Sequence, residues 1–410
     1  MSVVRCICIR KYLASFNGQL ATINGHHLKL SHNKSVMIVA GEASGDIYGA
    51  HLAMAIKELD PCIEFFGLGG PEMERAGVRI MHQLSSMAVV GMTEIIPKSR
   101  YIFRALRELK RSLQVTPPDL LILIDYPGFN LHLAKKAHSF GIPVLYYIPP
   151  QVWAWREGRV RKIAKRVDRV AVILPFEKEF YRMHGIKVEY VGHPLLDISL
   201  PERDKEEIKE SLDINHNKTP ILGLLPGSRD EEIESLLPVM IGAAEIISRD
   251  YPNLYCILPL ASTVKEDLVA PYIKNAKIDI KIERLDTKAI LKIADLALIA
   301  SGTATLEAAI METPMVIAYK VSFVSYMLGL FLIKVSHVGL VNLVAGRAIV
   351  PELIQGKATA LRLAEEAVAI LKNETLKRDM KKSLKLVHEQ IGRGGAAKKA
   401  AHIAGEMMGL

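Results

Sequence analysis

The strongest constraint on the fold of this chain is the alternation of short, wholly apolar runs with longer stretches of helical patterning. Residues 36–40 and 120–124 are typical of buried strands, whereas 47–59 and 102–113 carry apolar side chains at helical spacing. Strands that alternate with helices predict βαβ units, parallel sheets and ligands at the carboxyl ends of the strands. The expected strands are 36–40, 120–124, 144–148, 170–174, 221–225, 254–259, 278–282, 296–300 and 315–318.

A polar and charged segment, 201–220, separates the two sets of strands. We therefore expect an α/β fold with two Rossmann-like domains whose parallel sheets face each other across a cleft, which suits a chain of 410 residues. The predicted organisation is an N-terminal extension (1–35), a first domain (36–200), a second domain (201–358) and C-terminal helices (359–410) that pack back on the first domain.

The charge balance favours phosphate-bearing partners without choosing among them. Lys and Arg number 53 against 44 Asp and Glu, a net charge of +9 that suits nucleotides, anionic lipids or nucleic acid. The four cysteines include no C-x-x-C pair, so neither a zinc site nor a disulfide framework is expected. D-x-D and H-E-x-x-H are also missing, and no bound metal is predicted.

The N-terminus is basic, because residues 1–41 contain five Lys or Arg and the first acidic residue is Glu42. One interpretation is a simple extension before the first strand. The other is an organellar targeting peptide, which is also poor in acidic residues.

The most apolar uncharged run, 321–333, has thirteen residues between Lys320 and Lys334, too few to cross a bilayer. One interpretation is a buried core helix. The other is a surface helix that enters a bilayer interface, with the flanking lysines near lipid phosphates. The membrane contacts would then be Phe323, Leu328, Leu330, Phe331 and Leu332.

A glycine-containing loop follows the first expected strand and opens a helix. Its residues G-E-A-S-G-D include Glu42, Ser44, Gly45 and Asp46. Glycine permits close approach of the backbone to a ligand, and a helix N-terminus favours anions. The dinucleotide and P-loop patterns are absent, and a plain strand–helix turn is the alternative.

A second loop, S-G-T-A-T-L-E, follows the expected strand 296–300. Ser301, Gly302 and Thr303 place two hydroxyls and a glycine where backbone N–H groups converge, which suits a diphosphate. Glu307, about one turn further on, could accept hydrogen bonds from a ribose diol. The alternative is a helix capped by Ser301 or Thr303.

Two further strand ends carry charged side chains. Arg229, in G-S-R-D, has a planar fork that suits a diphosphate, unless it is an inert surface residue. Asp125, in D-Y-P-G-F-N, directly follows the apolar strand 120–124. Partial burial there would raise its pKa and suit it to general-base work. A helix cap or an Asx turn before Pro127 is the alternative.

Both tryptophans, Trp153 and Trp155, follow a Pro-Pro corner, and residues 156–169 are rich in Arg and Lys. Aromatic rings give apolar contact to a sugar or acyl chain, and neighbouring cations suit an anionic lipid headgroup. A solvated basic face is the plain alternative. Because no nucleic-acid-binding motif is recognised, no nucleic-acid partner is expected.

Together these loops resemble those of the lipid-A-disaccharide synthases, glycosyltransferases of lipopolysaccharide assembly. The resemblance extends in order from about residue 36 to 355, which makes it specific. The matching stretches are V-A-G-E-A-S-G-D (39–46), G-L-G-G-P-E-M (67–73), V-V-G-M-T-E (89–94), D-Y-P-G-F-N (125–130), P-P-Q-V-W-A-W (149–155), V-G-H-P-L-L-D (191–197), P-G-S-R (226–229), A-S-G-T-A-T-L-E (300–307) and V-N-L-V-A-G-R (341–347).

The resemblance implies a GT-B fold, with the acceptor in the first domain, the UDP-sugar in the second, and neither a cofactor nor a catalytic metal. The family joins UDP-2,3-diacylglucosamine to 2,3-diacylglucosamine 1-phosphate (lipid X) with inversion, giving a β-1,6 disaccharide 1-phosphate and UDP. Asp125 matches the carboxylate proposed as base for the acceptor's 6-hydroxyl. The expected substrate-binding residues are Glu42, Ser44, Gly45, Asp46, Asn130, Trp153, Arg229, Ser301, Gly302, Thr303, Glu307 and Asn342.

The resemblance also implies a peripheral protein on the cytoplasmic face of the inner membrane and suggests a homodimer, while the basic N-terminus leaves organellar targeting open. Two other functions stay open on the residues alone. One is another GT-B enzyme of UDP-sugars, such as a lipid-linked N-acetylglucosaminyltransferase or an epimerase. The other is a non-catalytic, membrane-associated nucleotide-binding protein.

Overall fold

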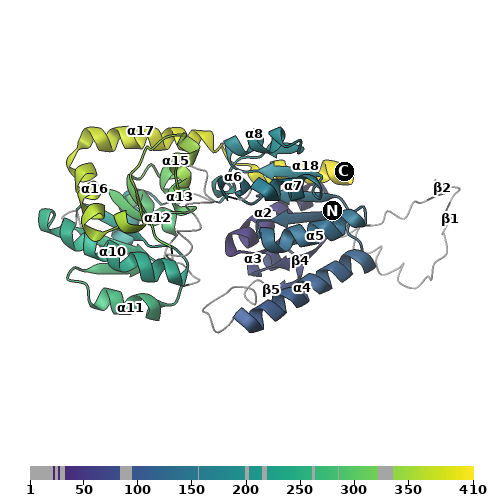
Figure 1. Cartoon of the computed structure of the whole chain (residues 1–410), viewed down its shortest axis with the longest axis horizontal. Helices are drawn as coiled ribbons and strands as arrows, with labels where there is room; N and C mark the ends of the chain where they lie inside the picture. The colour runs from purple at the N-terminus through teal and green to yellow at the C-terminus, as the bar shows by residue number, and fades with distance from the viewer. Residues whose placement is uncertain are drawn as a thin grey trace. The chain divides into compact units, whose positions relative to one another are not determined.

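The computed structural model describes residues 33–83, 95–155, 157–198, 203–214, 219–260, 264–284, 286–321 and 336–410, together with 22–23 and 26–27 (Figure 1). The chain divides into two units, Met1–Lys34 and Ser35–Leu410. The described residues of the first unit form a short antiparallel pair, β1 (Thr22–Ile23) and β2 (His26–His27). The second unit holds two parallel sheets.

The first sheet has seven strands, and the pair at its centre is apolar on both faces because helices cover each side. Ala40 pairs with Ile124, so these two central strands end side by side and the residues that follow them are neighbours. In spatial order the strands are β5 (Val78–Gln83), β4 (Glu64–Gly69), β3 (Ser35–Ala40), β6 (Leu120–Ile124), β7 (Val144–Tyr147), β8 (Arg169–Val172) and β9 (Val188–Tyr190).

Alternate side chains of β3 enter two different cores, as the two-residue period of a strand requires. Val36 and Ile38 pack with α2 (Ala43–Leu59) and α18 (Ala396–Met408), whereas Met37 and Val39 pack with residues of α4 (Ile95–Val115) and α5 (Pro127–Ser139). The remaining helices of this half are α3 (Pro71–Arg75), α6 (Val152–Trp155), η3 (Glu157–Arg159), α7 (Val160–Ala164), α8 (Pro175–Met183) and η4 (Pro194–Leu196).

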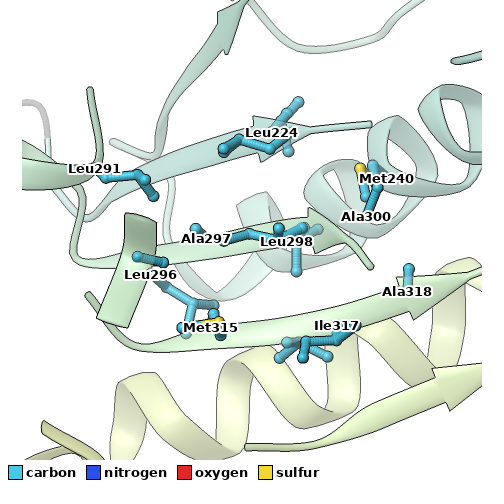
Figure 2. Packing of buried hydrophobic residues seen from close by; sticks show 14 of the residues in the cluster. Leu224, Met240, Leu291, Leu296, Ala297, Leu298, Ala300, Met315, Ile317 and Ala318 are labelled. Atoms are coloured by element: carbon cyan, nitrogen blue, oxygen red, sulfur yellow. The ribbon is translucent and has the colours of Figure 1, made fainter. Parts of the chain in front are cut away.

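The second sheet has six parallel strands and its own core. Figure 2 shows Leu224, Leu298 and Ile317 on three neighbouring strands of this core, with Met240 on an adjacent helix. The strands in spatial order are β12 (Ile280–Glu283), β11 (Tyr255–Pro259), β10 (Ile221–Leu225), β13 (Leu296–Ala300), β14 (Met315–Tyr319) and β15 (Glu352–Ile354). The helices are α9 (Lys205–Ser211), α10 (Asp230–Asp250), α11 (Glu266–Lys274), α12 (Thr287–Ile293), α13 (Ala304–Ile310), α15 (Leu340–Ala345), η5 (Gln355–Lys357), α16 (Ala360–Lys372) and α17 (Glu374–Gln390).

The C-terminal helix α18 returns to the first sheet and packs on α2. Its start is fixed by Asp197, whose carboxylate accepts the backbone N–H groups of Gly395, Ala396 and Ala397 at 2.6, 3.1 and 2.7 Å. The two passages of the chain between the sheets therefore contact each other at this point.

The prediction of an α/β fold with two parallel sheets is confirmed. Most expected strands agree with those observed to within one or two residues, and 120–124, 221–225 and 296–300 agree at both ends. The strands β4, β5, β9 and β15 were not anticipated, and the polar segment 201–220 contains the helix α9. The exact domain boundaries stay predictions.

Candidate functional site

Asp125 lies at the end of β6 in a strained turn. Asp125 and Tyr126 have φ angles of 44° and 46°, both in the left-handed region that non-glycine residues seldom adopt. The turn is held by neighbours, because the Asn130 amide donates to the carbonyl oxygens of Ile124 and Asp125 at 3.1 and 2.7 Å, and the Tyr146 hydroxyl donates to that of Asp125 at 2.7 Å. Strain that the surroundings enforce is typical of functional sites.

The environment of the Asp125 carboxyl group shifts its pKa toward neutral pH. Burial, followed by the nearby charge of Glu42, raises its pKa from 3.8 to about 6. A hydrogen bond from the Tyr126 N–H and the charge of Arg229 oppose that rise. The carboxylate is therefore ionised at pH 7 while its proton affinity exceeds that of an ordinary Asp, as a general base requires.

The loop after β3 lies against the Asp125 turn. A Cβ atom on Gly41 would come within 2.2 Å of the Tyr126 ring, so glycine is needed for the two loops to meet. Glu42 occupies the N-cap position of α2 and is about half exposed, and Ser44 is exposed in the first turn of that helix. The predicted residues Glu42 and Ser44 are thus both accessible, and Glu42 is close enough to Asp125 to affect its pKa.

Gly45 and Asp46 of the same loop face inward. A Cβ on Gly45 would contact Ala40 at 3.3 Å, so the glycine lets α2 pack closely on the sheet. Asp46 is 3% exposed, and its carboxylate accepts the backbone N–H groups that begin α3 at 2.8 to 3.0 Å. These two residues shape the loop, and a direct substrate contact for either stays a prediction.

Arg229 brings a cation from the second sheet to this place. It is the N-cap residue of α10, and its side chain is 70% exposed. One guanidinium nitrogen lies 3.3 Å from Glu232 and the other lies 3.9 Å from Glu42 of the first sheet. The loops after β3, β6 and β10 therefore bring Glu42, Asp125 and Arg229 near one another, and their roles in one substrate site stay predictions.

The loop after β13 leaves room for a ligand. A Cβ on Gly302 would meet no atom within 4 Å, and Thr303 is exposed and makes no side-chain cap hydrogen bond. The Ser301 hydroxyl instead donates to the carbonyl oxygen of Val338 at 2.9 Å. Within the first turn of α13, the N–H groups of Thr305 and Leu306 donate to the carbonyl oxygens of Gly302 and Thr303 at 3.1 and 2.9 Å. An anion at this loop would therefore be bound by the N–H groups of Gly302 and Thr303, which precede that turn.

Glu307 follows on α13, in a largely buried position. Burial, and then Asp286, raises its pKa to about 7, while Lys288 opposes the rise. Burial, and then Glu307, raises the pKa of Tyr48 on α2. Glu307 of the second sheet and Tyr48 of α2 are therefore close enough for the charge of Glu307 to affect the Tyr48 hydroxyl.

Trp153 is part of the protein framework. Its indole Nε1 donates to the buried carboxylate of Glu177 at 3.0 Å, and its ring packs edge-on against Phe176 with centroids 4.8 Å apart. Burial raises the pKa of Glu177 to about 7, against the effect of the hydrogen bonds it accepts from Trp153 and from the backbone N–H groups of Leu174 and Ile173, which precede α8. A sugar or acyl contact for Trp153 stays a prediction.

Asn342 is fully buried, and its amide is engaged on both sides. The nitrogen donates to the Val350 carbonyl oxygen at 2.9 Å and to Glu352 at 2.7 Å, while the oxygen accepts the N–H groups of Ile349 and Val350. Glu352 also accepts from the backbone of Gly339. Asn342 thus fixes the segment beside Ser301, and its predicted contact with the nucleotide is untested.

Four contributors to this site were missed in the sequence: Tyr48, Tyr146, Glu177 and Lys288. Each lies inside a helix or strand and carries no local motif, so only the three-dimensional contacts reveal it. Lys288, although charged, is 2% exposed, and its burial is visible only in the structure.

The proposed membrane contacts Phe323, Leu328, Leu330, Phe331 and Leu332 lie outside the described residues. In the part of the chain that is described, no helix combines the length and apolar character needed to span a bilayer. Over those same ranges, no three His, Cys, Asp or Glu side chains form a group that could hold a metal ion.

Comparison with known proteins decides the family. The sequence profile described as lipid-A-disaccharide synthetase matches residues 36–406. Lipid-A-disaccharide synthases from Geobacter metallireducens and Syntrophus aciditrophicus are 45% and 46% identical, over 92% and 91% of this chain and 98% and 97% of theirs. That from Coxiella burnetii is 43% identical over 90% of this chain and 98% of its own.

The chain belongs to the lipid-A-disaccharide synthase family. It is accordingly a glycosyltransferase of lipid A biosynthesis. Among solved structures, UDP-GlcNAc 2-epimerase from Neisseria meningitidis matches with a TM-score of 0.65 at 12% identity, covering 91% of this chain and 100% of that one. The calicheamicin glycosyltransferase CalG4 matches at 0.56 and 12%, covering 92% and 98%. This likeness concerns the fold alone, which is GT-B as expected.

Proposed function

We propose that this family member transfers the diacylglucosaminyl group of UDP-2,3-diacylglucosamine to the 6-hydroxyl of lipid X, with inversion and without a catalytic metal or other cofactor. The observation that carries the proposal is that Arg229, after a strand of the second sheet, lies 3.9 Å from Glu42, whose loop packs against the Asp125 turn of the first sheet. An inverting glycosyl transfer needs a base for the acceptor hydroxyl and a cation that binds the departing diphosphate. Here the two groups follow strands of different sheets.

The proposed acceptor side is the first sheet. Ionised Asp125 takes the proton of the acceptor's 6-hydroxyl while that oxygen bonds to the donor's anomeric carbon. The strained turn fixes the carboxylate in place before the substrate arrives, so little orientation has to be achieved during the reaction. Proton transfer to a positioned base of this kind contributes about 10²- to 10⁴-fold to rate.

The proposed donor side is the second sheet. As the bond from the anomeric carbon to the diphosphate oxygen breaks, negative charge grows on departing UDP. Arg229 and the N–H groups at Gly302 and Thr303 would stabilise that charge, and Glu307 would accept hydrogen bonds from the ribose diol. The exposure of Arg229 and Thr303 and the space beside Gly302 support this assignment.

Both proposed substrates carry acyl chains, so we propose that the enzyme works peripherally on the cytoplasmic face of the inner membrane. The segment 321–333, between Lys320 and Lys334, stays the proposed contact on its apolar sequence. Whether two copies associate is a further prediction that the family resemblance suggests.

The test mixes the purified protein with UDP-2,3-diacylglucosamine and lipid X in a chelator-containing buffer. The products are analysed by mass spectrometry, and the sugar nucleotide is analysed by proton NMR, which distinguishes isomers of equal mass. We expect a tetraacyl disaccharide 1-phosphate and one equivalent of UDP. Conversion of the sugar nucleotide to an isomer of the same mass, with no disaccharide, would instead indicate an epimerase. Absence of any product would refute the proposal.

A further inference from the structure

An apolar stripe runs along the exposed face of α2, starting beside Asp125. Ser44, Ile47, His51 and Met54 follow one another at helical spacing and so share one face. Ile47 and Met54 are 36% and 46% exposed, although both are large and apolar. The other faces of α2 are covered by β3 and α18. This face therefore leaves apolar surface open next to the candidate catalytic turn.

The stripe borders a cavity of about 190 Å³ between α2 and α3. Its apolar lining comes from Ile47, Met54 and the small side chains of Ala50 and Ala76. The polar residues of its lining are His51 and the charged pair Glu72 and Arg75, which contact each other. Because those charges are already compensated, the cavity is suited to an uncharged apolar group.

Contacts between two sequence motifs hold together the two helices that line this cavity. Asp46 of G-E-A-S-G-D accepts the N–H groups of Gly70, Glu72 and Met73 in G-L-G-G-P-E-M, which ties the start of α3 to α2. Gly49 keeps the helices close, since a Cβ there would lie 2.8 Å from the Met73 sulfur. The helix pair is thus a preformed support for the open face.

We propose that this cavity binds an acyl chain of the acceptor sugar whose hydroxyl lies at Asp125. The inference rests on the proposed function and adds the place where one acyl chain of the bound acceptor sugar lies. Ser44, about one turn before Ile47 on the same face, lies at the polar end of the stripe, so a sugar beside Glu42 and Ser44 directs its chain along Ile47 toward Met54. The cavity is a specificity site for chain length.

The experiment measures KM for lipid X analogues of decreasing acyl length, at saturating donor, for the wild type and for Ile47→Ser combined with Met54→Gln. Each methylene that leaves the cavity should raise the wild-type KM by up to about fourfold. The double variant should lose most of this dependence and keep its kcat with short-chain acceptors. The matched control is Leu59→Gln, an exposed apolar residue of the same helix that does not line the cavity.

A second variant fills the cavity instead of changing its polarity. Ala76→Phe should raise KM at least tenfold for long-chain acceptors and leave short-chain acceptors unaffected. If the double variant and Ala76→Phe both retain the wild-type dependence on chain length while disaccharide is still formed, the cavity assignment is wrong and the transferase proposal stands.

A binding measurement tests the cavity proposal even if the transferase proposal fails. A pyrene-labelled fatty acid is titrated into the wild type, Ala76→Phe and Leu59→Gln. Tenfold weaker binding by Ala76→Phe alone supports the cavity even if no disaccharide is formed by any of the proteins. Equal binding by all three proteins overturns it.

Discussion

Replacing Asp125 by Asn should make the protein more stable at neutral pH. Burial and Glu42 raise the pKa of Asp125 from 3.8 to about 6, so the fold disfavours the ionised carboxylate. Asn cannot ionise, can still accept the Tyr126 N–H bond, and is among the residues that best tolerate the left-handed conformation found here. The substitution therefore removes the charge and little else.

The magnitude follows from the pKa difference. A rise of about two units corresponds to about 3 kcal/mol, at 1.36 kcal/mol per unit. Because the folded state holds the proton more tightly than the unfolded chain, the wild type loses this stability between about pH 4 and pH 6. The advantage of Asp125→Asn should be absent below pH 4, grow through that window, and stay at up to about 3 kcal/mol above pH 6.

Urea denaturation of both proteins at pH 4 and pH 7.5 measures the difference. Asp213→Asn is the matched control, because Asp213 is also left-handed but exposed. The control should change stability little at either pH. If Asp125→Asn gives the same stability difference at both pH values, or destabilises the protein at pH 7.5, the assignment of a strained, partly desolvated carboxylate is refuted.

Three further expectations concern the site. Arg229→Ala should raise the KM for the UDP-sugar or lower kcat by about 10- to 100-fold, the scale of a hydrogen bond to a charged group, and unchanged kinetics would dismiss its role at the diphosphate. The wild-type kcat/KM should climb about tenfold per pH unit below pH 6 and level off above it as Asp125 ionises, so a flat profile from pH 5 to 7.5 would contradict the base assignment. Trp153→Phe should lower the free energy of unfolding by about 1–3 kcal/mol, because Glu177 loses a buried donor, and unchanged stability in urea denaturation would contradict that role.

The fold could be predicted from the sequence wherever a strand is apolar on both faces. The run L-L-I-L-I at 120–124 has no other compatible structure beside helical neighbours. β4 was missed, and it contains Gly67 and Gly69, a residue type that is uncommon inside strands. Gly67 is required inside the strand, since a Cβ there would lie 1.9 Å from the carbonyl oxygen of Ile38. A glycine that permits close approach of two backbones cannot be distinguished locally from one in a turn.

Loops could be located from the sequence, but the direction of each side chain in them could not. The residues of G-E-A-S-G-D all follow β3, yet Glu42 is exposed beside Arg229 while Asp46 is buried and caps α3. Likewise, the side-chain amide of Asn342 points inward, because it donates hydrogen bonds to Glu352 and to the backbone carbonyl oxygen of Val350. Which atoms a polar group bonds depends on elements far away in the chain, and no local pattern encodes them.

The most direct test of the central claim is to measure turnover and UDP affinity together for Asp125→Asn. If Asp125 is the base opposite the departing UDP, disaccharide formation should fall by about 10²- to 10⁴-fold while the Kd for UDP stays within about twofold of the wild type. Near-normal turnover would contradict the account, and so would a loss of UDP binding equal to the loss of turnover.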